Sequence, residues 1–263
     1  MASALFSGKK VVVTGGSKGI GYAIAKRFAS DGADVYLLAS NTERLKNAAH
    51  TINAETGQKA GFCAQDLRVL KGCEAAHAAT MKDMGGVDIL INAAGATKGG
   101  RFLDQPDSEM LDGFDLKFHG AVRLCRLFWP ALTATKGTVI NIAGGFARTP
   151  DPDYMVGGAV NAALSNFTKA LAGQGLRDDV NVNWLHPGLT VTDRMDEILD
   201  RRAEMEGKSR EDVEREAIAN EGLRQLGSPE GVAALVAFLC GPDARHIHGT
   251  GIAIDGGGSK GYY

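Results

Sequence analysis

The sequence predicts an α/β fold: a doubly wound parallel sheet in a single domain. Short runs typical of strands alternate along the chain with segments long enough for crossover helices. The first of these runs leads directly into a glycine-rich turn and then into a helical pattern. We expect a helix after the turn at residues 22–29, and strands at residues 11–13, 35–38, 61–64, 87–91, 138–142, 180–184 and 251–254.

The glycine-rich turn has the spacing needed to bind a dinucleotide. Gly15 permits a tight turn, Gly19 lets the backbone approach a pyrophosphate, and Gly21 lets the helix pack closely on the strand. The free amides and the positive end of the helix would face the phosphates. Between a strand pattern and a helix pattern, such a turn predicts a Rossmann-like fold. The expected contacts here are Gly15, Ser17, Lys18, Gly19, Ile20 and Gly21.

Length and charge exclude several classes of protein. A single α/β domain accommodates 263 residues, and no repeat, linker or low-complexity tract divides them. A net charge of -2 gives no reason to invoke nucleic acid or an anionic membrane. The apolar stretches are too short for a membrane span and we find no signal peptide, so we expect a cytoplasmic protein. The cysteines lack metal-ligand spacing, and we expect no metal site.

Three further sequence blocks follow the turn in order and at suitable distances. Residues 92–95 (Asn-Ala-Ala-Gly) end the fourth strand, residues 187–188 (Pro-Gly) follow the sixth, and residues 254–257 (Ile-Asp-Gly-Gly) lie near the end of the chain. With these blocks, the chain resembles the short-chain dehydrogenases/reductases from about Gly8 to Gly257. The resemblance implies a nicotinamide cofactor, a small-molecule substrate and an oxidoreductase.

The resemblance also implies where the rest of the cofactor lies. In that family the Asn-Ala-Ala-Gly block supports the sheet beside the cofactor. The residues after the third strand hold the adenine, and the loop after Pro-Gly holds the nicotinamide end. The residues implied by these matches are Asn92, Ala93, Gly95, Asp66, Leu67, Pro187, Gly188, Leu189, Thr190 and Thr192.

Charge at the end of the second strand favours NADP(H) over NAD(H). An acidic residue there would accept the ribose hydroxyls of NAD and repel the extra phosphate of NADP. This chain has Ala39-Ser40-Asn41, and we expect Ser40 and Asn41 to line this end of the site. Lys18 could reach a 2′-phosphate, as the equivalent basic residue does in NADP-preferring relatives; a solvated surface lysine is the alternative.

The catalytic residues of the family are replaced in this chain. The resemblance implies an Asn-Ser-Tyr-Lys set, in which tyrosine transfers the proton and lysine lowers its pKa and binds the ribose. Serine orients the carbonyl, and asparagine anchors a water relay. Another register would make Tyr154 the usual tyrosine, but it puts the following helix out of phase. Aligned on the fifth strand and on that helix, the four positions are Lys117, Gly144, Gly157 and Asn161.

Three interpretations of this substitution pattern stay open. In the first, Tyr154 and Lys117 replace the missing tyrosine and lysine, with Asn161 beside them, acting on a small carbonyl or alcohol or on a polarised enone or enoyl group. A displaced tyrosine is similar to the enoyl reductase branch, although Tyr154 could merely line the pocket. In the second, water or the substrate's own acidity replaces the tyrosine. In the third, a weakly catalytic or non-catalytic nucleotide-binding chain serves as a regulatory or partner subunit.

Two further expectations concern the periphery. Residues 194–222 are dense in charged side chains, which fits a solvated helix pair and equally a helical insertion that acts as a substrate lid. The resemblance implies a homodimer or homotetramer that pairs through the helices holding Lys117 and Asn161. Phe128, Trp129 and Leu132 add apolar surface late in the first of these helices.

Overall fold

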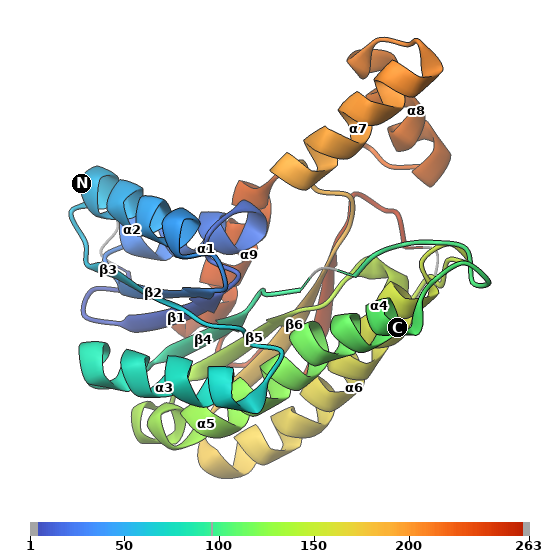
Figure 1. Cartoon of the computed structure of the whole chain (residues 1–263). Coiled ribbons are helices and arrows are strands. Elements are labelled where there is room, and N and C mark those ends of the chain that lie inside the picture. The colour runs from blue at the N-terminus through green and yellow to red at the C-terminus, as the bar shows by residue number, and fades with distance from the viewer. Residues whose placement is uncertain (1–4, 96, 260–263) are drawn as a thin grey trace.

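Parallel strands form the centre of the structure, a computed structural model that describes residues 5–95 and 97–259. In this part of the chain a seven-stranded sheet has the order β3-β2-β1-β4-β5-β6-β7, with every neighbouring pair parallel (Figure 1). The predicted doubly wound, Rossmann-like fold is confirmed. The strands are β1 (Lys10–Thr14), β2 (Asp34–Ala39), β3 (Ala60–Ala64), β4 (Ile89–Asn92), β5 (Thr138–Ile142), β6 (Asn181–Pro187) and β7 (Gly251–Ile254).

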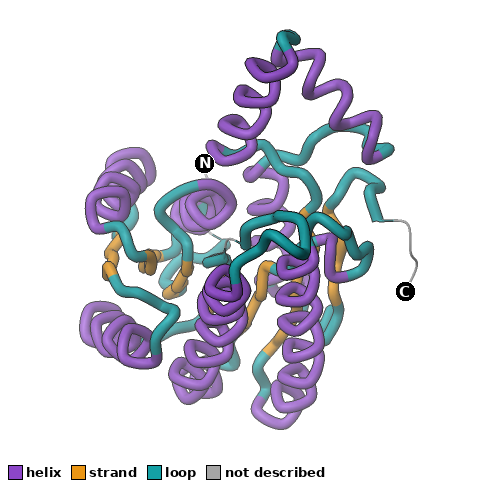
Figure 2. The backbone as a smooth tube through the Cα atoms, turned by 45° about the vertical axis from the view of Figure 1, so that its right-hand side comes forward, coloured by secondary structure: helices purple, strands orange, loops and turns teal. Residues whose placement is uncertain are grey.

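Helices cover both faces of the sheet (Figure 2). On one face α1, α2 and α9 enclose a core that includes Phe28 and Val236, and on the other α3, α5 and α6 enclose a core that includes Cys73 and Leu124. Burial of these apolar side chains stabilises both layers. The helices are α1 (Gly19–Ser30), α2 (Thr42–Thr56), α3 (Leu70–Met84), α4 (Asp107–Gly113), α5 (Gly120–Thr135), α6 (Met155–Asp178), α7 (Asp193–Glu206), α8 (Arg210–Glu221) and α9 (Pro229–Cys240).

The end of α5 packs mostly against the core of this chain. Phe128 and Leu132 are fully buried in the core under the sheet, because residues four apart share one face of a helix. Trp129 is partly buried, and its indole nitrogen donates to Asp178 at 2.7 Å. The expectation that Phe128 and Leu132 contribute apolar surface to a subunit interface is therefore wrong.

Helices α7 and α8 project from the body of the molecule as a pair (Figure 1). They share a small apolar cluster that includes Leu199 and Val213. Arg210 of α8 bonds Asp196 at 2.7 Å and Asp200 at 2.6 Å, both on α7. This arrangement is compatible with a solvated helix pair and with a lid, so the lid stays a prediction.

A buried amide network joins the central strands to α6. Asn92 of β4 donates to Asn141 of β5 at 2.9 Å, and Asn141 donates to the Thr168 hydroxyl at 2.8 Å. All three side chains are almost inaccessible to solvent. Because parallel strands end at one edge, this network fixes the sheet directly beneath the edge where the site lies.

Breaking this network should weaken the fold. Asn141→Leu removes the acceptor of the Asn92 amide, and a buried polar group left without its partner costs about 1–3 kcal/mol. We expect the free energy of unfolding, measured by urea denaturation, to fall by about that amount. Changing both Asn92 and Asn141 to leucine should lower the free energy of unfolding by less than the sum of the single changes, because neither amide is then left without the other as its partner. Strictly additive losses would contradict the coupling.

Candidate functional site

The glycine-rich turn closes tightly against the end of β4. Gly15 has a φ of 67°, and a Cβ atom there would lie 3.0 Å from the backbone of Ala94. A Cβ atom on Gly21 would overlap the carbonyl group of Gly15. The Thr14 hydroxyl accepts hydrogen bonds from the amides of Ala93 at 3.0 Å and Ala94 at 2.9 Å. The turn and the β4 end are thus held as one unit at the start of α1.

A groove of about 490 Å³ runs along this unit. The N-terminus of α1 lies beside it, so unpaired helix amides and the positive end of the helix dipole are available to an anion. Asn92 is one of the expected contacts, but it lies behind the groove in the buried amide network. The expected contacts that line the groove are Gly15, Ser17, Lys18, Gly19, Ile20, Gly21, Ser40, Asn41, Asp66, Leu67, Ala93, Gly95 and Thr192.

Two arginines in the groove were not among the expected contacts. Asn41 caps α2, and its side chain accepts from the amide of Arg44 at 2.9 Å, so the first turn of α2 places Arg44 on the groove wall. Arg68 donates to both carboxylate oxygens of Asp66, from Nε to Oδ1 at 2.9 Å and from Nη2 to Oδ2 at 3.0 Å. These bonds lower the pKa of Asp66. An N-cap asparagine three residues before an arginine is the signal that would have identified Arg44.

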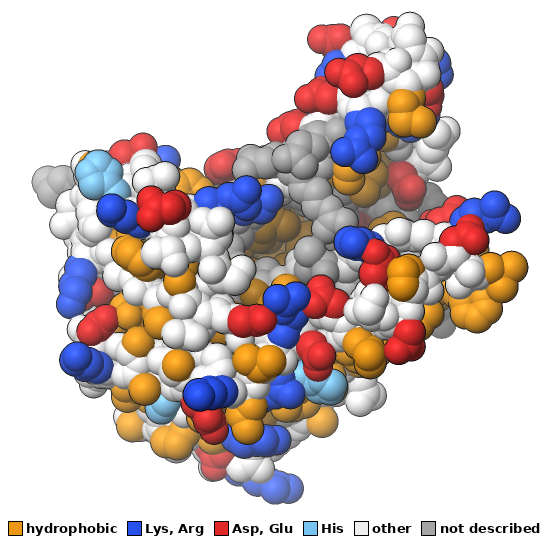
Figure 3. All heavy atoms as spheres, in the orientation of Figure 1, with side chains coloured by type: hydrophobic (Ala, Val, Ile, Leu, Met, Phe, Trp, Pro, Cys, Tyr) orange, Lys and Arg blue, Asp and Glu red, His pale blue; other side chains and the backbone are white. Residues whose placement is uncertain are grey.

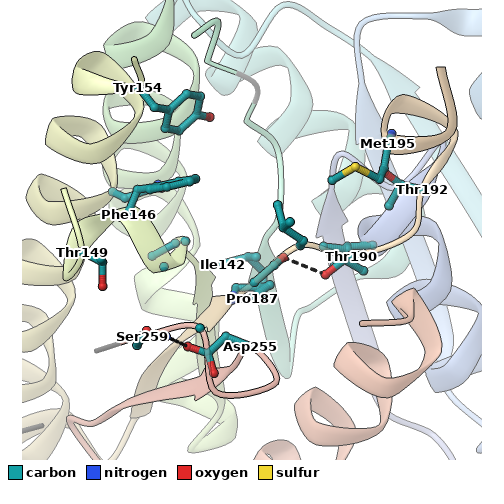
Figure 4. Close-up of a pocket in the computed structure, with 18 of the residues that line it drawn as sticks. Ile142, Phe146, Thr149, Tyr154, Pro187, Thr190, Thr192, Met195, Asp255 and Ser259 are labelled. Carbon is teal, nitrogen blue, oxygen red and sulfur yellow. Dashed lines mark hydrogen bonds between the residues drawn. The ribbon is translucent and has the colours of Figure 1, made fainter. Parts of the chain in front are cut away.

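A cavity of about 380 Å³ continues the groove between the body and the α7–α8 pair. Figure 3 shows this face hollowed below the projecting helices, with hydrophobic side chains inside. The two hollows share Ile20, Ala93, Gly95 and Thr192, so a ligand can extend from one into the other. The loop after β6 forms part of the cavity wall through Pro187, Gly188, Leu189 and Thr190. Figure 4 shows aromatic and polar side chains facing this space from one side and Met195 from the other.

Tyr154 occupies the space that Gly157 leaves free. Tyr154 is the N-cap residue just before α6, and a Cβ atom on Gly157 would overlap the tyrosine ring. The ring packs against Phe146 with centroids 5.0 Å apart, and both side chains project into the cavity (Figure 4). Its hydroxyl bonds the Thr97 hydroxyl and also lies 3.3 Å from the Thr97 carbonyl oxygen, to which it can donate.

Lys117 reaches the same cavity from a π-helical turn, Phe114–His119. Its methylenes cover Gly95, where a Cβ atom would lie 2.7 Å from the lysine Cδ. Its ammonium group donates to the Ala143 carbonyl at 3.0 Å. Lys117 and Tyr154 therefore line one cavity, but the hydrogen bonds described for them go to different partners, so their action as a pair stays a prediction.

Asn161 lies beside Gly144, and these are the two residues that the sequence alignment predicts at the family's lysine and serine positions. Asn161 is 3% exposed and lines the cavity, and its amide lies over the Cα of Gly144. The three expected catalytic side chains, Lys117, Tyr154 and Asn161, are thus brought to one cavity.

A buried histidine fixes the backbone at Gly144. Trp184 donates from its indole nitrogen to Nε2 of His186 at 2.9 Å, which leaves Nδ1 to donate to the Gly144 carbonyl at 2.9 Å. Burial lowers the pKa of His186, so the imidazole is neutral. The ring therefore acts as a rigid strut for the cavity wall.

Sequence and structure comparisons agree on the family. A family model described as "Enoyl-(Acyl carrier protein) reductase" matches residues 15–259. The chain belongs to the short-chain dehydrogenase/reductase family. It is 27% identical to a 3-oxoacyl-[acyl-carrier-protein] reductase of Chlamydia muridarum over 97% of this chain and 99% of that protein.

Solved structures of this family superpose closely. L-sorbose reductase from Gluconobacter frateurii, complexed with NADPH and L-sorbose, is 30% identical, with 100% of each chain covered and a TM-score of 0.95. A 7α-hydroxysteroid dehydrogenase complexed with NADH is 25% identical, covers 100% of this chain and 98% of its own, and has a TM-score of 0.87. Family membership therefore implies a nicotinamide cofactor without deciding between the two dinucleotides.

We find neither a membrane-spanning helix nor a metal site in the described ranges, 5–95 and 97–259. No helix there has the length and apolarity to cross a membrane. No group of three or more His, Cys, Asp and Glu side chains in those ranges could hold a metal ion.

The buried histidine should make stability depend on pH. Its folded-state pKa lies below the usual 6.5, so the unfolded chain binds the proton more readily. Stability is then complete above about pH 6.5 and falls below it by up to about 1.4 kcal/mol per pH unit. We expect His186→Phe to be less stable at neutral pH and to lose part of this acid dependence in urea denaturation between about pH 7.5 and pH 5. Equal pH slopes in both proteins would contradict this assignment.

Proposed function

We propose that this chain is an NADP(H)-dependent oxidoreductase that transfers hydride to or from a small carbonyl or alcohol, or to a polarised enone or enoyl group. The observation that carries the proposal is the continuity of the two hollows, with Lys117 and Tyr154 lining the second. When bound, a nicotinamide dinucleotide supplies or accepts the hydride. The residues of this chain bind and orient it, and they handle the proton and the developing charge.

The groove suits a dinucleotide for reasons of backbone chemistry. Gly19 and Gly21 have no side chain, so the backbone amides at the start of α1 can approach an anion in the groove closely. Asp66 and Leu67 line the groove, and we assign them to the adenine. The loop that includes Leu189, Thr190 and Thr192 lines the cavity, and we assign it to the nicotinamide.

Positive charge in the groove supports NADP(H) over NAD(H). Lys18 and Arg44 both line the groove and also a shallower hollow beside it, and neither Ser40 nor Asn41 adds a carboxylate. The relatives include an NADPH complex and an NADH complex, so our proposal of NADP(H) rests on this charge argument. Two cations at one end of the groove fit a 2′-phosphate.

Removing either cation should weaken NADPH selectively. Arg44→Ala and Lys18→Ala are each expected to raise the NADPH Kd about tenfold, because hydrogen bonds to charged groups contribute about 1.5–3 kcal/mol. The NADH Kd should change little. Lys46→Ala is the matched control, since it removes a neighbouring cation of α2 that does not line the groove. Fluorescence titration showing equal NADPH and NADH affinities in the unmodified chain would contradict the preference.

Proton transfer is assigned to Tyr154 and charge stabilisation to Lys117. In carbonyl reduction the substrate oxygen gains negative charge, and in enoyl reduction an enolate forms. In both cases a cation close to the developing negative charge stabilises the product of hydride addition. Tyr154 is a hydroxyl donor in the same cavity, and its bond to Thr97 orients the phenol and connects it to a second hydroxyl.

A regulatory or partner subunit is the second candidate function. It is favoured by the loss of serine, tyrosine and lysine at Gly144, Gly157 and Asn161, since a nucleotide-binding chain without catalysis has no need of them. Turnover separates the two candidates. Our proposals of a homodimer or homotetramer and of a lid formed by residues 194–222 are compatible with both.

Loss of the phenol should slow turnover and leave cofactor binding intact. Tyr154→Phe is expected to lower the rate of NADPH oxidation about 10²- to 10⁴-fold. The probe substrates are L-sorbose, an acetoacetyl thioester and a crotonyl thioester. Lys117→Met should behave similarly, and Tyr36→Phe, which changes a tyrosine bonded to Asp83 away from both hollows, should retain activity.

Each outcome of that experiment favours one interpretation. Unchanged turnover in both Tyr154→Phe and Lys117→Met would replace the displaced pair with water or substrate-assisted catalysis. If the unmodified chain binds NADPH but oxidises it with none of the probes, the partner-subunit function gains support.

A further inference from the structure

Gly144 is required for space and not for backbone conformation. Its φ of -178° is an extended conformation that any residue adopts. A Cβ atom there would lie 2.7 Å from Nδ2 and 3.2 Å from Cγ of Asn161. Any side chain at residue 144 would therefore push against the Asn161 amide. Glycine at 144 and asparagine at 161 are complementary parts of one packing arrangement.

The surroundings limit how far this arrangement can relax. The His186 strut holds the Gly144 carbonyl, and the Lys117 ammonium holds the preceding carbonyl, that of Ala143. Asn161 belongs to the long helix α6, which packs against β6. The amide therefore sits between two fixed backbones, and turning about χ2 is its easiest motion.

The Asn161 amide is incompletely bonded in the free protein. Its Oδ1 atom is buried and has no hydrogen-bond partner. Four side-chain atoms of this kind occur in the described residues, and two of them, Asn161 Oδ1 and Thr149 Oγ1, belong to side chains that line the same cavity. Native proteins rarely leave such groups unpaired, so their concentration at one cavity indicates groups that a ligand satisfies.

We propose that the Asn161 amide is a ligand-contacting group that accepts a hydrogen bond from a hydroxyl of the bound ligand, and that Gly144 exists to give this amide its room. A turn about χ2 brings the oxygen to the cavity wall. The residue at the family's lysine position is then an acceptor in this chain, where a lysine could only donate. The inference rests on the proposed NADP(H)-dependent function.

Two hydroxyls could donate to this oxygen: one on the ribose next to the nicotinamide, or the alcohol of the reacting molecule. The probes separate them. 2′,5′-ADP carries only the adenosine half of NADP, 2′-phospho-ADP-ribose adds the second ribose, and sorbitol is a polyol alcohol tested on the NADPH complex. Binding is measured by calorimetry for the nucleotides and by the shift in melting temperature for sorbitol.

Asn161→Leu removes the unpaired Oδ1 atom and replaces the amide with an apolar side chain of similar size. We expect the free protein to melt at the same or a higher temperature, because the buried unpaired acceptor is lost. We also expect about a tenfold loss of affinity for the hydroxyl-bearing probe and unchanged affinity for 2′,5′-ADP. Asn161→Asp keeps an acceptor and should retain most of the affinity. A loss confined to 2′-phospho-ADP-ribose assigns the ribose, and a loss confined to sorbitol assigns the substrate alcohol.

Asn183→Leu is the matched control for a purely structural asparagine. Asn183 is buried, and both of its amide atoms are bonded: the nitrogen donates to the Ile247 carbonyl at 2.6 Å and the oxygen accepts from the Thr250 amide at 3.1 Å. This variant should melt at a lower temperature and bind the probes normally. If Asn161→Leu behaves in the same way, its role is structural and the proposal is overturned.

Gly144→Ala provides an independent test, because its methyl group displaces the amide without altering it. We expect it to reproduce the affinity loss of Asn161→Leu. Combining Gly144→Ala with Asn161→Ala should add little to either single change, since both act on one contact. Additive losses, or unchanged probe affinity in all variants, would overturn the inference. If the unmodified chain binds neither nucleotide, the NADP(H) proposal itself fails.

Discussion

Close approach between the glycine-rich turn and the end of β4 is the constraint on which the site depends. Gly15 and Gly21 leave no room for a Cβ atom, and the Thr14 hydroxyl ties the turn to two amides of the following block. The start of α1 is thereby fixed beside the groove, and the cavity begins where the groove ends. The buried Asn92–Asn141–Thr168 network supports this edge from below. This role explains why the 92–95 block contains Asn92, although the Asn92 side chain does not line the groove.

The sequence was sufficient for the fold and for most of the groove, because both depend on local patterns. Strand periodicity, the glycine spacing and the family blocks identify the sheet and the residues along its edge. Arg44 was missed because its position depends on where α2 begins, which the Asn41 cap decides. Phe128 and Leu132 were misjudged because apolar character alone does not distinguish a core from an interface, whereas the helix face does.

The catalytic region was harder to predict because its residues act through space. Matching the sequence to the family predicts which positions are replaced, but it gives no sign that the Tyr154 ring covers Gly157 or that the Asn161 amide covers Gly144. It also cannot show the Trp184–His186 strut that holds the Gly144 carbonyl. Each of these contacts is set by the three-dimensional packing, and no regular spacing in the sequence predicts it.

These contacts bear on whether the site is eroded or reorganised. Large-to-small changes that no neighbour compensates leave cavities, and such cavities destabilise the surrounding protein. Here a neighbouring side chain fills the space at each of the two glycines, and both fillers are polar groups in the cavity. Filling with apolar side chains would have restored packing at lower cost, since an unpaired buried amide oxygen costs about 1–3 kcal/mol. Retention of polar groups at that cost is expected of a site that contacts a polar ligand, and it argues for a reorganised binding site over a decaying one.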